Sequence, residues 1–549
     1  MKITINNRVI ESDNPIRIRE IIDDPDYKYM VAKVNNRIRE LNYRIPYDAT
    51  VELLDLTDVR AMKIYDATLR YVVAMAAKRL FPKARIYFNY SISRSVFAGF
   101  SGFGRPFTME DLQELEKEVK TIISADLTLV RKKMSLEEAI KVYKKQGFTD
   151  KIKVLEYRKD EIGMMYECDG FYDYMYDFML PSTGYLKKFE FKYYSPGFLI
   201  LYPRAECNGE IPPFEDEKVF REVIREANSW GNILKINTIA QLNDTVHEGR
   251  ALELINICET RHNNQLADLG KKICKEIERT RLVCVAGPSS SGKTTFTNRL
   301  RIELLARGVE PILISMDDFY FTNAEEYPKD EFGKPDYEHL NALDLDLFDS
   351  VIYKLINGEK VKLPRFDFKT KKRTFTKAIR INSKQPILVE GIHALDDAIC
   401  PSVPQEQKFK IFIAPLAQYG LDDHTPISLS DMRLIRRIVR DKQFRNTGCE
   451  STLALWQSVR AGEFRWIYKY QNNADSVFNS ELAYEPLVLA KYAIPVLDEV
   501  PEESPQFVTA SRLKRFLKYY ESISDKWIPC NSILREFVGG SIFYTDDKK

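Results

Sequence analysis

The chain has 549 residues, of which 44% are hydrophobic and 30% are charged, and its formal net charge is +2. This length exceeds what one hydrophobic core supports, so we expect about three domains. The near-neutral charge gives no overall field for nucleic acid or an anionic membrane, and no apolar run approaches the ~20 residues of a membrane span. The eight cysteines form no C-x-x-C pair and the chain starts with Met1-Lys2-Ile3, without a signal peptide, which predicts a cytoplasmic protein with reduced thiols.

Residues 1–60 are predicted to form a small β-rich domain. Short apolar runs and the turn residues between them indicate strands at 2–5 and 8–10, a helix at 16–22, and strands at 29–34 and 50–54. This order, with Val31-Ala32-Lys33-Val34-Asn35 and the stretch 48–53, resembles the TGS domain, a ubiquitin-like β-grasp module of threonyl-tRNA synthetases. The resemblance implies a domain that binds or docks and carries no catalytic residues.

Residues 61–222 resemble the second additional domain of threonyl- and alanyl-tRNA synthetases, which hydrolyses mischarged tRNA. The stretches 65–71, 106–112 and 171–181 carry this resemblance. The family site is an H-x-x-x-H and a later C-x-x-x-H, and the four matching positions here are Tyr65, Leu69, Met175 and Met179. Because these side chains are poor zinc ligands, we predict a degenerate editing-like domain without a catalytic metal. Contact with RNA or tRNA through the N-terminal domains stays open.

Residues 223–279 are predicted to form a helical connector. Apolar residues such as Leu266, Leu269 and Ile273 recur at helical spacing with charges between them. His247 and His262 fall in this segment, far in sequence from any matching ligand, so we interpret them as surface or packing residues. The connector is expected to pack the two halves of the chain together.

The segment 287–294, Gly-Pro-Ser-Ser-Ser-Gly-Lys-Thr, matches the phosphate-binding P-loop pattern G-x-x-x-x-G-K-[ST]. An apolar strand at 282–286 precedes it and a helix at 295–307 follows it, which is the context that the motif needs; a chance Gly/Ser turn is the alternative. The glycines let backbone N–H groups face phosphate oxygens, and the helix N-terminus adds a favourable dipole. Lys293 is expected at the β- and γ-phosphates and Thr294 on magnesium. The predicted ATP-binding residues of this region are Gly287, Pro288, Ser289, Ser290, Ser291, Gly292, Lys293, Thr294 and Thr295.

Two further apolar strands end in carboxylates. The run 311–316 leads to Asp317 and Asp318, and the run 385–389 leads to Glu390. In a doubly wound sheet the carboxyl ends of the strands line the active cleft. Asp317 is therefore the predicted general base, and Thr294, Asp317 and Glu390 are the predicted magnesium ligands. The alternatives are an N-cap role for the aspartates and a purely structural role for Glu390.

The segment 431–441 predicts a helix with a basic face. Arg433, Arg436, Arg437 and Arg440 follow the spacing i, i+3, i+4 and i+7, so they share one side. Four guanidiniums on one face suit a lid that closes over a triphosphate. A solvated basic face or a patch for RNA is the alternative.

The stretch from Leu282 to Ala490 resembles uridine kinase and the wider uridine kinase/phosphoribulokinase branch of P-loop kinases. Besides the P-loop and the arginine helix, the resemblance rests on 315–320, 336–339 with Asp344, 366–368 and 390–392. It implies that Asp317 and Lys293 are catalytic. It also implies that Arg433, Arg436 and Arg440 contact phosphates.

The same resemblance implies a substrate pocket. Its predicted residues are Tyr320, Glu338, Phe366, Phe368 and Lys371. Lys371 stands where the family has a histidine that helps to read the base, and the basic run 369–373 makes the pocket more cationic. Phosphoryl transfer is therefore predicted, and the cationic pocket favours an anionic acceptor as the alternative to uridine.

We predict a multidomain α/β and α+β chain with an N-terminal β-grasp, an α+β editing-like domain, the helical connector and, at 280–549, a P-loop kinase with a doubly wound parallel sheet. The predicted function is Mg-ATP-dependent phosphorylation of a nucleoside, uridine or cytidine, to its 5′-monophosphate. The alternatives are a kinase of another hydroxyl compound, such as a sugar phosphate or an acid, and an RNA-binding regulatory protein with ATP-gated binding. ATP and a small-molecule acceptor are the expected partners; a homo-oligomer stays open and no membrane contact is expected.

Overall fold

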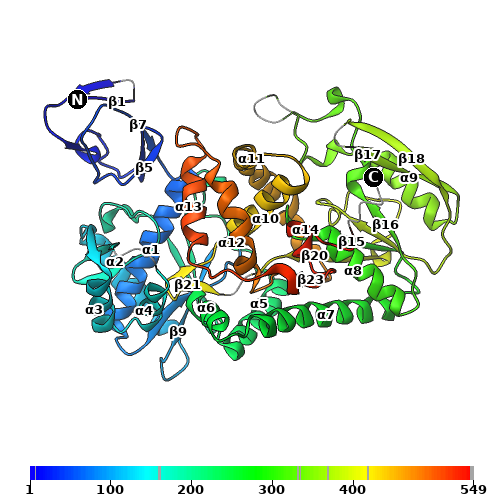
Figure 1. Cartoon of the computed structure of the whole chain (residues 1–549), viewed down its shortest axis with the longest axis horizontal. Helices are drawn as coiled ribbons and strands as arrows, with labels where there is room; N and C mark the ends of the chain where they lie inside the picture. The colour runs from blue at the N-terminus through cyan, green and yellow to red at the C-terminus, as the bar shows by residue number, and fades with distance from the viewer. Residues whose placement is uncertain are drawn as a thin grey trace.

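The computed structural model describes residues 1–6, 8–158, 162–329, 333, 335–367, 370–416 and 419–543. Figure 1 shows a small β module at the N-terminus, an α/β module around helix α1, and a P-loop body to which a long helix, α7, leads. The predicted multidomain α/β and α+β class is confirmed. Within the described residues, no helix is long and apolar enough to cross a membrane.

The N-terminal module is a five-stranded sheet with the order β2-β1-β7-β4-β5. Its strands are β1 (Lys2–Ile5), β2 (Arg8–Glu11), β4 (Val31–Val34), β5 (Arg37–Arg39) and β7 (Ala49–Leu54). The predicted helix at 16–22 is wrong, because this segment forms the short strand β3 (Ile16–Arg17), paired with β6 (Arg44–Ile45), and a single 3₁₀ turn. The N–H groups of Ile18 and Arg19 donate to the carbonyls of Tyr43 and Leu41, and these tertiary bonds outweigh the weak tendency of a seven-residue segment to form a helix.

The second module packs helix α1 against two antiparallel sheets. Its helices are α1 (Val59–Leu80), α2 (Met109–Ser124), α3 (Leu136–Gln146) and α4 (Thr149–Glu156). One sheet has the order β13 (Glu190–Tyr194), β14 (Gly197–Leu201), β9 (Val96–Ser101) and β8 (Arg85–Phe88), and the other has the order β10 (Val130–Ser135), β11 (Ile162–Cys168) and β12 (Phe171–Asp173).

The four positions that match the editing ligands lie in the apolar core of this second module. Tyr65, Leu69, Met175 and Met179 are all at most 2% exposed. The hydroxyl of Tyr65 donates to the carbonyl of Lys188 at 2.8 Å. These four buried side chains thus stand at the positions where the editing family has imidazoles and a thiolate. The absence of deacylation activity stays a prediction.

Three helices connect the second module to the P-loop body: α5 (Lys218–Leu234), α6 (Ile239–His247) and α7 (Ala251–Lys275). Figure 1 shows α7 extending along the P-loop body, and α7 contacts the helix that follows the P-loop. His262 on α7 is buried and its Nε2 lies 3.0 Å from the carbonyl of Glu481. Burial holds the pKa of His262 well below its ordinary value, so this histidine packs as a neutral ring.

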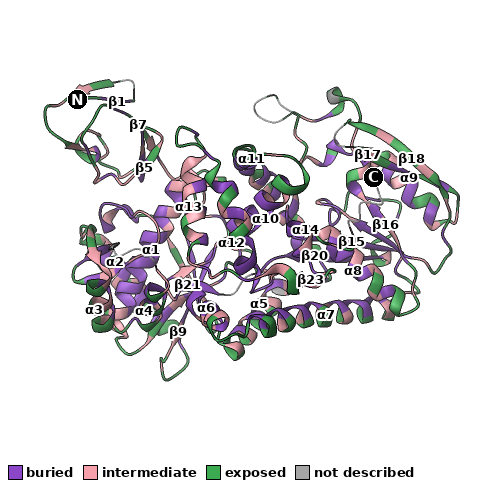
Figure 2. Cartoon of the chain, in the orientation of Figure 1, coloured by how far each residue is buried: buried purple, intermediate pink, exposed green. Residues whose placement is uncertain are grey.

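The P-loop body is built on a parallel sheet with the order β16-β19-β15-β20-β23. The strands are β15 (Leu282–Ala286), β16 (Ile312–Ser315), β19 (Ile387–Glu390), β20 (Lys408–Ala414) and β23 (Ser476–Asn479). The helices are α8 (Lys293–Ala306), α9 (Leu345–Ile356), α10 (Leu429–Phe444), α11 (Cys449–Gly462), α12 (Glu485–Asp498), α13 (Phe507–Leu517) and α14 (Arg535–Val538). Two hairpins complete it: β17 (Val361–Asp367) with β18 (Lys372–Ile379), and β21 (Gly420–Asp422) with β22 (Thr425–Pro426). Residues of β15 and β20 are buried throughout, as expected for a sheet covered on both faces (Figure 2).

The β21–β22 hairpin joins the P-loop body to the second module through a buried ionic cluster. The Lys151 ammonium lies 2.7 Å from the Asp173 carboxylate and 3.0 Å from that of Asp422, and all three side chains are at most 2% exposed. Burial opposes the charge of Lys151, but the two carboxylates outweigh burial and raise its pKa. The Nδ1 of His424 lies 2.5 Å from Asp173. Removing one partner of such a buried cluster typically lowers the stability of the fold by about 3–5 kcal/mol. The cluster therefore fixes the second module to the P-loop body at a point close to the start of α10 at Leu429.

Candidate active site

The P-loop connects the end of β15 to the start of α8. Gly287 has no room for a side chain, since a Cβ there would lie 2.1 Å from the carbonyl oxygen of Ile413 on the neighbouring strand. Gly292 has a φ of +90°, in the left-handed region that favours glycine. The two glycines therefore fix the tight path that turns the loop around the N-terminus of α8, the end of a helix that attracts anions.

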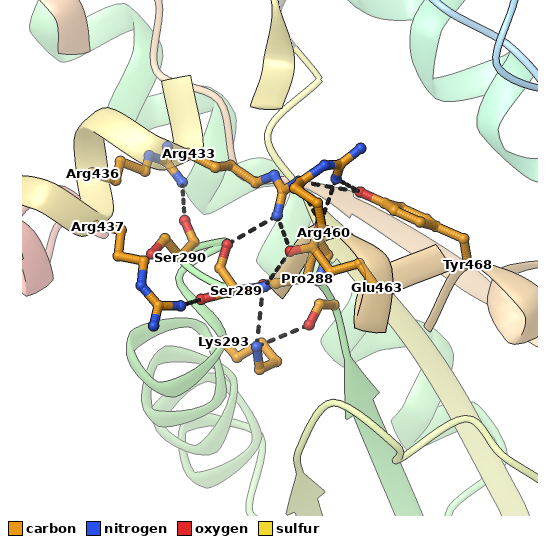
Figure 3. Close-up of polar contacts among 11 residues, drawn as sticks. Pro288, Ser289, Ser290, Lys293, Arg433, Arg436, Arg437, Arg460, Glu463 and Tyr468 are labelled. Atoms are coloured by element: carbon orange, nitrogen blue, oxygen red, sulfur yellow. Dashed lines mark hydrogen bonds and ion pairs between the residues drawn. The ribbon is translucent and has the colours of Figure 1, made fainter. Parts of the chain in front are cut away.

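Lys293 is the first residue of α8, and its side chain lies across the loop. The ammonium donates to the carbonyls of Gly287 at 2.9 Å and Pro288 at 3.2 Å (Figure 3). Burial lowers the pKa of Lys293, while the nearby carboxylates of Glu390 and Asp317 oppose this shift. The structure thus brings Lys293 together with the two acids that the sequence places at strand ends.

The two acids follow adjacent strands of the parallel sheet. Asp317 lies in the 3₁₀ turn after β16, and Glu390 is the last residue of β19. The hydroxyl of Ser315 donates to Oε1 of Glu390 at 2.8 Å. Burial, with the charge of Asp317, raises the pKa of Glu390 to about 7. Desolvation also raises the pKa of Asp317, against the pull of the Lys293 ammonium. The Glu390 side chain is half-buried, whereas Asp317 is exposed at the end of its strand.

Asp318 has a different role from its neighbour. Its carboxylate accepts from the guanidinium of Arg365 at 2.7 Å and from the backbone N–H of Phe366 at 3.1 Å. Both donors belong to β17, so Asp318 holds the β17–β18 hairpin against the strand end. Asp318 is therefore engaged with β17, whereas its neighbour Asp317 is the aspartate whose charge acts on Lys293.

The residues predicted to bind magnesium have a suitable chemistry. Thr294, Asp317 and Glu390 offer a hydroxyl and two carboxylates, and Mg²⁺ binds through one or two carboxylates, phosphate oxygens and several waters. Within the described residues, no group of three or more His, Cys, Asp or Glu side chains is placed to hold a metal ion. The predicted site of one hydroxyl and two carboxylates would leave the other positions around Mg²⁺ to phosphate oxygens and waters.

Two arginines of α10, the helix predicted to form a lid that closes over a triphosphate, contact the backbone of the P-loop. Arg436 is 0% exposed, pairs with Glu485 and donates to the carbonyl of Ser290 at 3.2 Å. Arg433 is 2% exposed, pairs with Glu463 and donates to the carbonyl of Ser289 at 3.1 Å. Figure 3 shows both guanidiniums directed at the P-loop backbone. The donors of Arg433 and Arg436 thus hold the loop in place through the carbonyls and carboxylates around them, and their contact with nucleotide phosphates stays a prediction.

The other two arginines of α10, Arg437 and Arg440, contact side chains near the P-loop. Arg437 donates to the hydroxyl of Ser289 at 2.9 Å, and Arg440 lies 4.0 Å from the carboxylate of Glu536. The role of Arg440 on phosphate stays a prediction. Arg437, which the resemblance did not assign, is the arginine of this helix that contacts a P-loop side chain.

Glu463 is a site residue that sequence reasoning missed. Its carboxylate accepts from the backbone N–H of Ser289 at 3.1 Å and pairs with Arg433 and Arg460. Burial would raise the pKa of Glu463, but the two guanidiniums outweigh burial and lower it. The sequence carries no signal for this role, because Glu463 follows α11, 30 residues from Arg433 and 174 from Ser289.

Two of the predicted substrate residues lie close to the turn that carries Asp317: Tyr320 directly follows this turn, and Phe366 lies on β17. The rings of Tyr320 and Phe366 have centroids 5.9 Å apart, and the Lys371 ammonium lies 3.5 Å from the hydroxyl of Tyr337. Burial, with the charge of Glu463, raises the pKa of Glu338 to about 7. Phe368, also predicted here, lies outside the described residues.

Arg373 is a second residue that sequence reasoning did not single out. It donates to the carbonyl of Tyr320 at 2.8 Å and to Asp344 at 2.9 Å. The guanidinium thereby ties β18 to the turn that carries Asp317. The basic run at 369–373 thus supplies at least one structural contact as well as the charge that the sequence indicates.

The P-loop body is similar in sequence to a family of known proteins. The model of the phosphoribulokinase/uridine kinase family matches residues 282–482. A uridine kinase of Ureaplasma urealyticum is 33% identical over 178 residues, which cover 32% of this chain and 77% of that protein. The chain belongs to the phosphoribulokinase/uridine kinase family. A solved structure of a possible uridine kinase from Bacillus stearothermophilus aligns over 39% of this chain and 100% of that chain, with 18% identity and a TM-score of 0.27.

A second group of relatives matches the N-terminal region. A threonine–tRNA ligase of Syntrophomonas wolfei is 35% identical over 159 residues, 29% of this chain. This kinase-family chain covers only 25% of that ligase. The predicted resemblance of the N-terminal region to threonyl-tRNA synthetases is confirmed.

Proposed function

We propose that this chain transfers the γ-phosphoryl group of ATP to a hydroxyl of a nucleoside, with uridine or cytidine as acceptor. Family membership supports a small-molecule kinase. The observation that carries the proposal is that the P-loop, Asp317 and Glu390 lie at the carboxyl ends of three adjacent parallel strands. Strand ends at this edge are where α/β sheets bind their ligands.

In this mechanism the P-loop binds the phosphates and Asp317 activates the acceptor. The backbone of the P-loop and the Lys293 ammonium hold the β- and γ-phosphates and balance the charge that spreads over the transferred group. The Asp317 carboxylate accepts the proton of the acceptor hydroxyl as its oxygen bonds to phosphorus and the bond to the β-phosphate oxygen breaks. Magnesium, when bound by Thr294, Asp317 and Glu390, would neutralise phosphate charge.

The aromatic residues of the predicted acceptor pocket suit a compound with a planar ring, such as a nucleoside. An anionic compound is the alternative. Tyr320 and Phe366 offer aromatic faces, and Glu338 offers a carboxylate for hydroxyl groups. Lys371 adds a cation beside Tyr337, which favours a sugar phosphate or an acid. The two acceptor classes therefore differ in what they need from Lys371.

A screen of ATP consumption tests the proposal. Turnover is expected with uridine or cytidine, and Lys371→Met should change the KM for these neutral acceptors little. If the acceptor is a sugar phosphate or an acid, the same substitution should raise its KM by roughly tenfold, because a charge-assisted contact is lost; the exposed Lys384→Met is the matched control. Failure of all nucleosides, sugars, sugar phosphates and acids to stimulate ATP consumption would contradict a kinase function.

RNA contact is a second candidate function, supported by a cavity of about 1600 Å³ between the second module and the P-loop body. Basic residues from both sides line it, among them Lys63, Arg131, Arg512 and Arg515. Stacked rings and guanidiniums suit nucleotides. We expect tRNA binding that weakens steeply with salt and a smaller salt slope for Arg131→Glu than for the control Lys384→Glu. Absence of binding at low salt would argue against this function.

A further inference from the structure

The C-terminal segment, residues 528–541, packs directly on the P-loop. Its short helix α14 contacts α10, as Figure 1 shows. Ile533, Leu534 and Phe537 are 0% exposed. A Cβ added to Gly292 of the P-loop would lie 2.5 Å from Cγ2 of Ile533. The segment therefore forms part of the wall around the phosphate-binding loop.

Glu536 of this segment reaches the N-terminus of α8. Its Oε2 accepts from the hydroxyl of Thr295 at 2.9 Å and from the backbone N–H of Thr295 at 3.4 Å. Its other carboxylate oxygen lies 4.0 Å from the guanidinium of Arg440. Backbone N–H groups at the start of a helix are the donors that bind phosphate in a P-loop. A carboxylate of this chain thus takes up donors that face a nucleotide phosphate.

The charge of Glu536 acts on the same centre. Its carboxylate lies at the N-terminus of α8, where Lys293 and Thr294 directly precede the Thr295 that it contacts. A triphosphate that enters must displace the carboxylate from Thr295 or bind against its charge.

We propose that Glu536 is a built-in competitor of the nucleotide, an autoinhibitory carboxylate that holds the phosphate position of α8 until ATP replaces it. This inference rests on the proposed binding of ATP at the P-loop. The apolar anchors Ile533, Leu534 and Phe537 keep the segment in place, and a change of the Glu536 side-chain rotamer is sufficient to free the donors. The C-terminal segment then sets the affinity for ATP.

Calorimetric titration of the full chain with Mg²⁺ and a non-hydrolysable ATP analogue tests the inference. Glu536→Gln keeps the size and an acceptor oxygen but removes the charge. We expect this variant to bind the analogue roughly tenfold more tightly than the wild type, because a charge-assisted bond no longer has to break. The control is Glu503→Gln, which changes an exposed carboxylate far from the loop in sequence and should leave binding unchanged.

Two further variants separate competition from a structural role. Glu536→Ala removes the acceptor as well and should bind the analogue at least as tightly as Glu536→Gln. Glu536→Asp keeps the charge on a shorter side chain and should lie between the wild type and Glu536→Gln. Wild-type binding together with unchanged or weaker binding by Glu536→Gln would overturn the inference and assign Glu536 to positioning of the loop. If neither protein binds the analogue, the proposed ATP site itself fails.

Discussion

Replacing Lys293 by alanine is expected to abolish phosphoryl transfer. Its ammonium lies over the P-loop, 2.9 Å from the carbonyl of Gly287, and beside Asp317 and Glu390. Removal of this cation takes away the fixed positive charge that faces the transferred group, which should lower the single-turnover rate by roughly a thousandfold or more, about 4 kcal/mol of barrier. The measurement is the rate of product formation at saturating Mg-ATP with the acceptor found in the screen.

A matched control separates catalysis from folding in this experiment. Lys384→Ala changes an exposed lysine in a loop of the same body and should keep the wild-type rate. Thermal unfolding of Lys293→Ala should stay close to that of the wild type, because the backbone contacts of the loop and the paired arginines of α10 remain. A Lys293→Ala variant that turns over at a near-normal rate would remove the P-loop from the mechanism.

The centre of the site could be predicted from the sequence because its geometry is local to single strands. A buried apolar strand followed at once by Asp317 or Glu390 places that acid at the carboxyl edge of a parallel sheet. The P-loop pattern likewise predicts the position of Lys293, because the motif is a short segment between one strand and the helix that follows it. No knowledge of distant contacts was needed for these residues.

The parts that the sequence did not reveal depend on pairings between distant segments. Glu463, Glu485 and Glu536 meet the P-loop or the arginines of α10 only after the chain has folded, and an isolated glutamate gives no signal of such a partner. The spacing of Arg433 and Arg436 correctly indicated a shared helix face. It could not indicate that buried carboxylates and loop carbonyls, and not solvent, would surround that face.

The same limit applies to the joint between the two halves. Lys151, Asp173 and Asp422 are ordinary surface-type residues in the sequence, yet they form a fully buried cluster. Buried charges of this kind are stable only when paired, so their pairing identifies an interface that hydrophobic periodicity does not show. The hairpin that carries Asp422 leads straight into α10, which links the position of the second module to the helix that holds the P-loop.

Asp317→Asn is the second change with a large expected effect. The amide keeps the size of the carboxylate but accepts no proton and binds magnesium poorly, so the single-turnover rate should fall by about 10²–10⁴-fold. ATP affinity should fall less, because Lys293 and the loop amides hold the phosphates independently. Asp318→Asn is the matched control: its carboxylate bonds to Arg365 and Phe366 of β17, and its loss should slow the reaction at least about tenfold less than Asp317→Asn. A crippled Asp318→Asn beside a near-normal Asp317→Asn would show that the base has been assigned to the wrong aspartate.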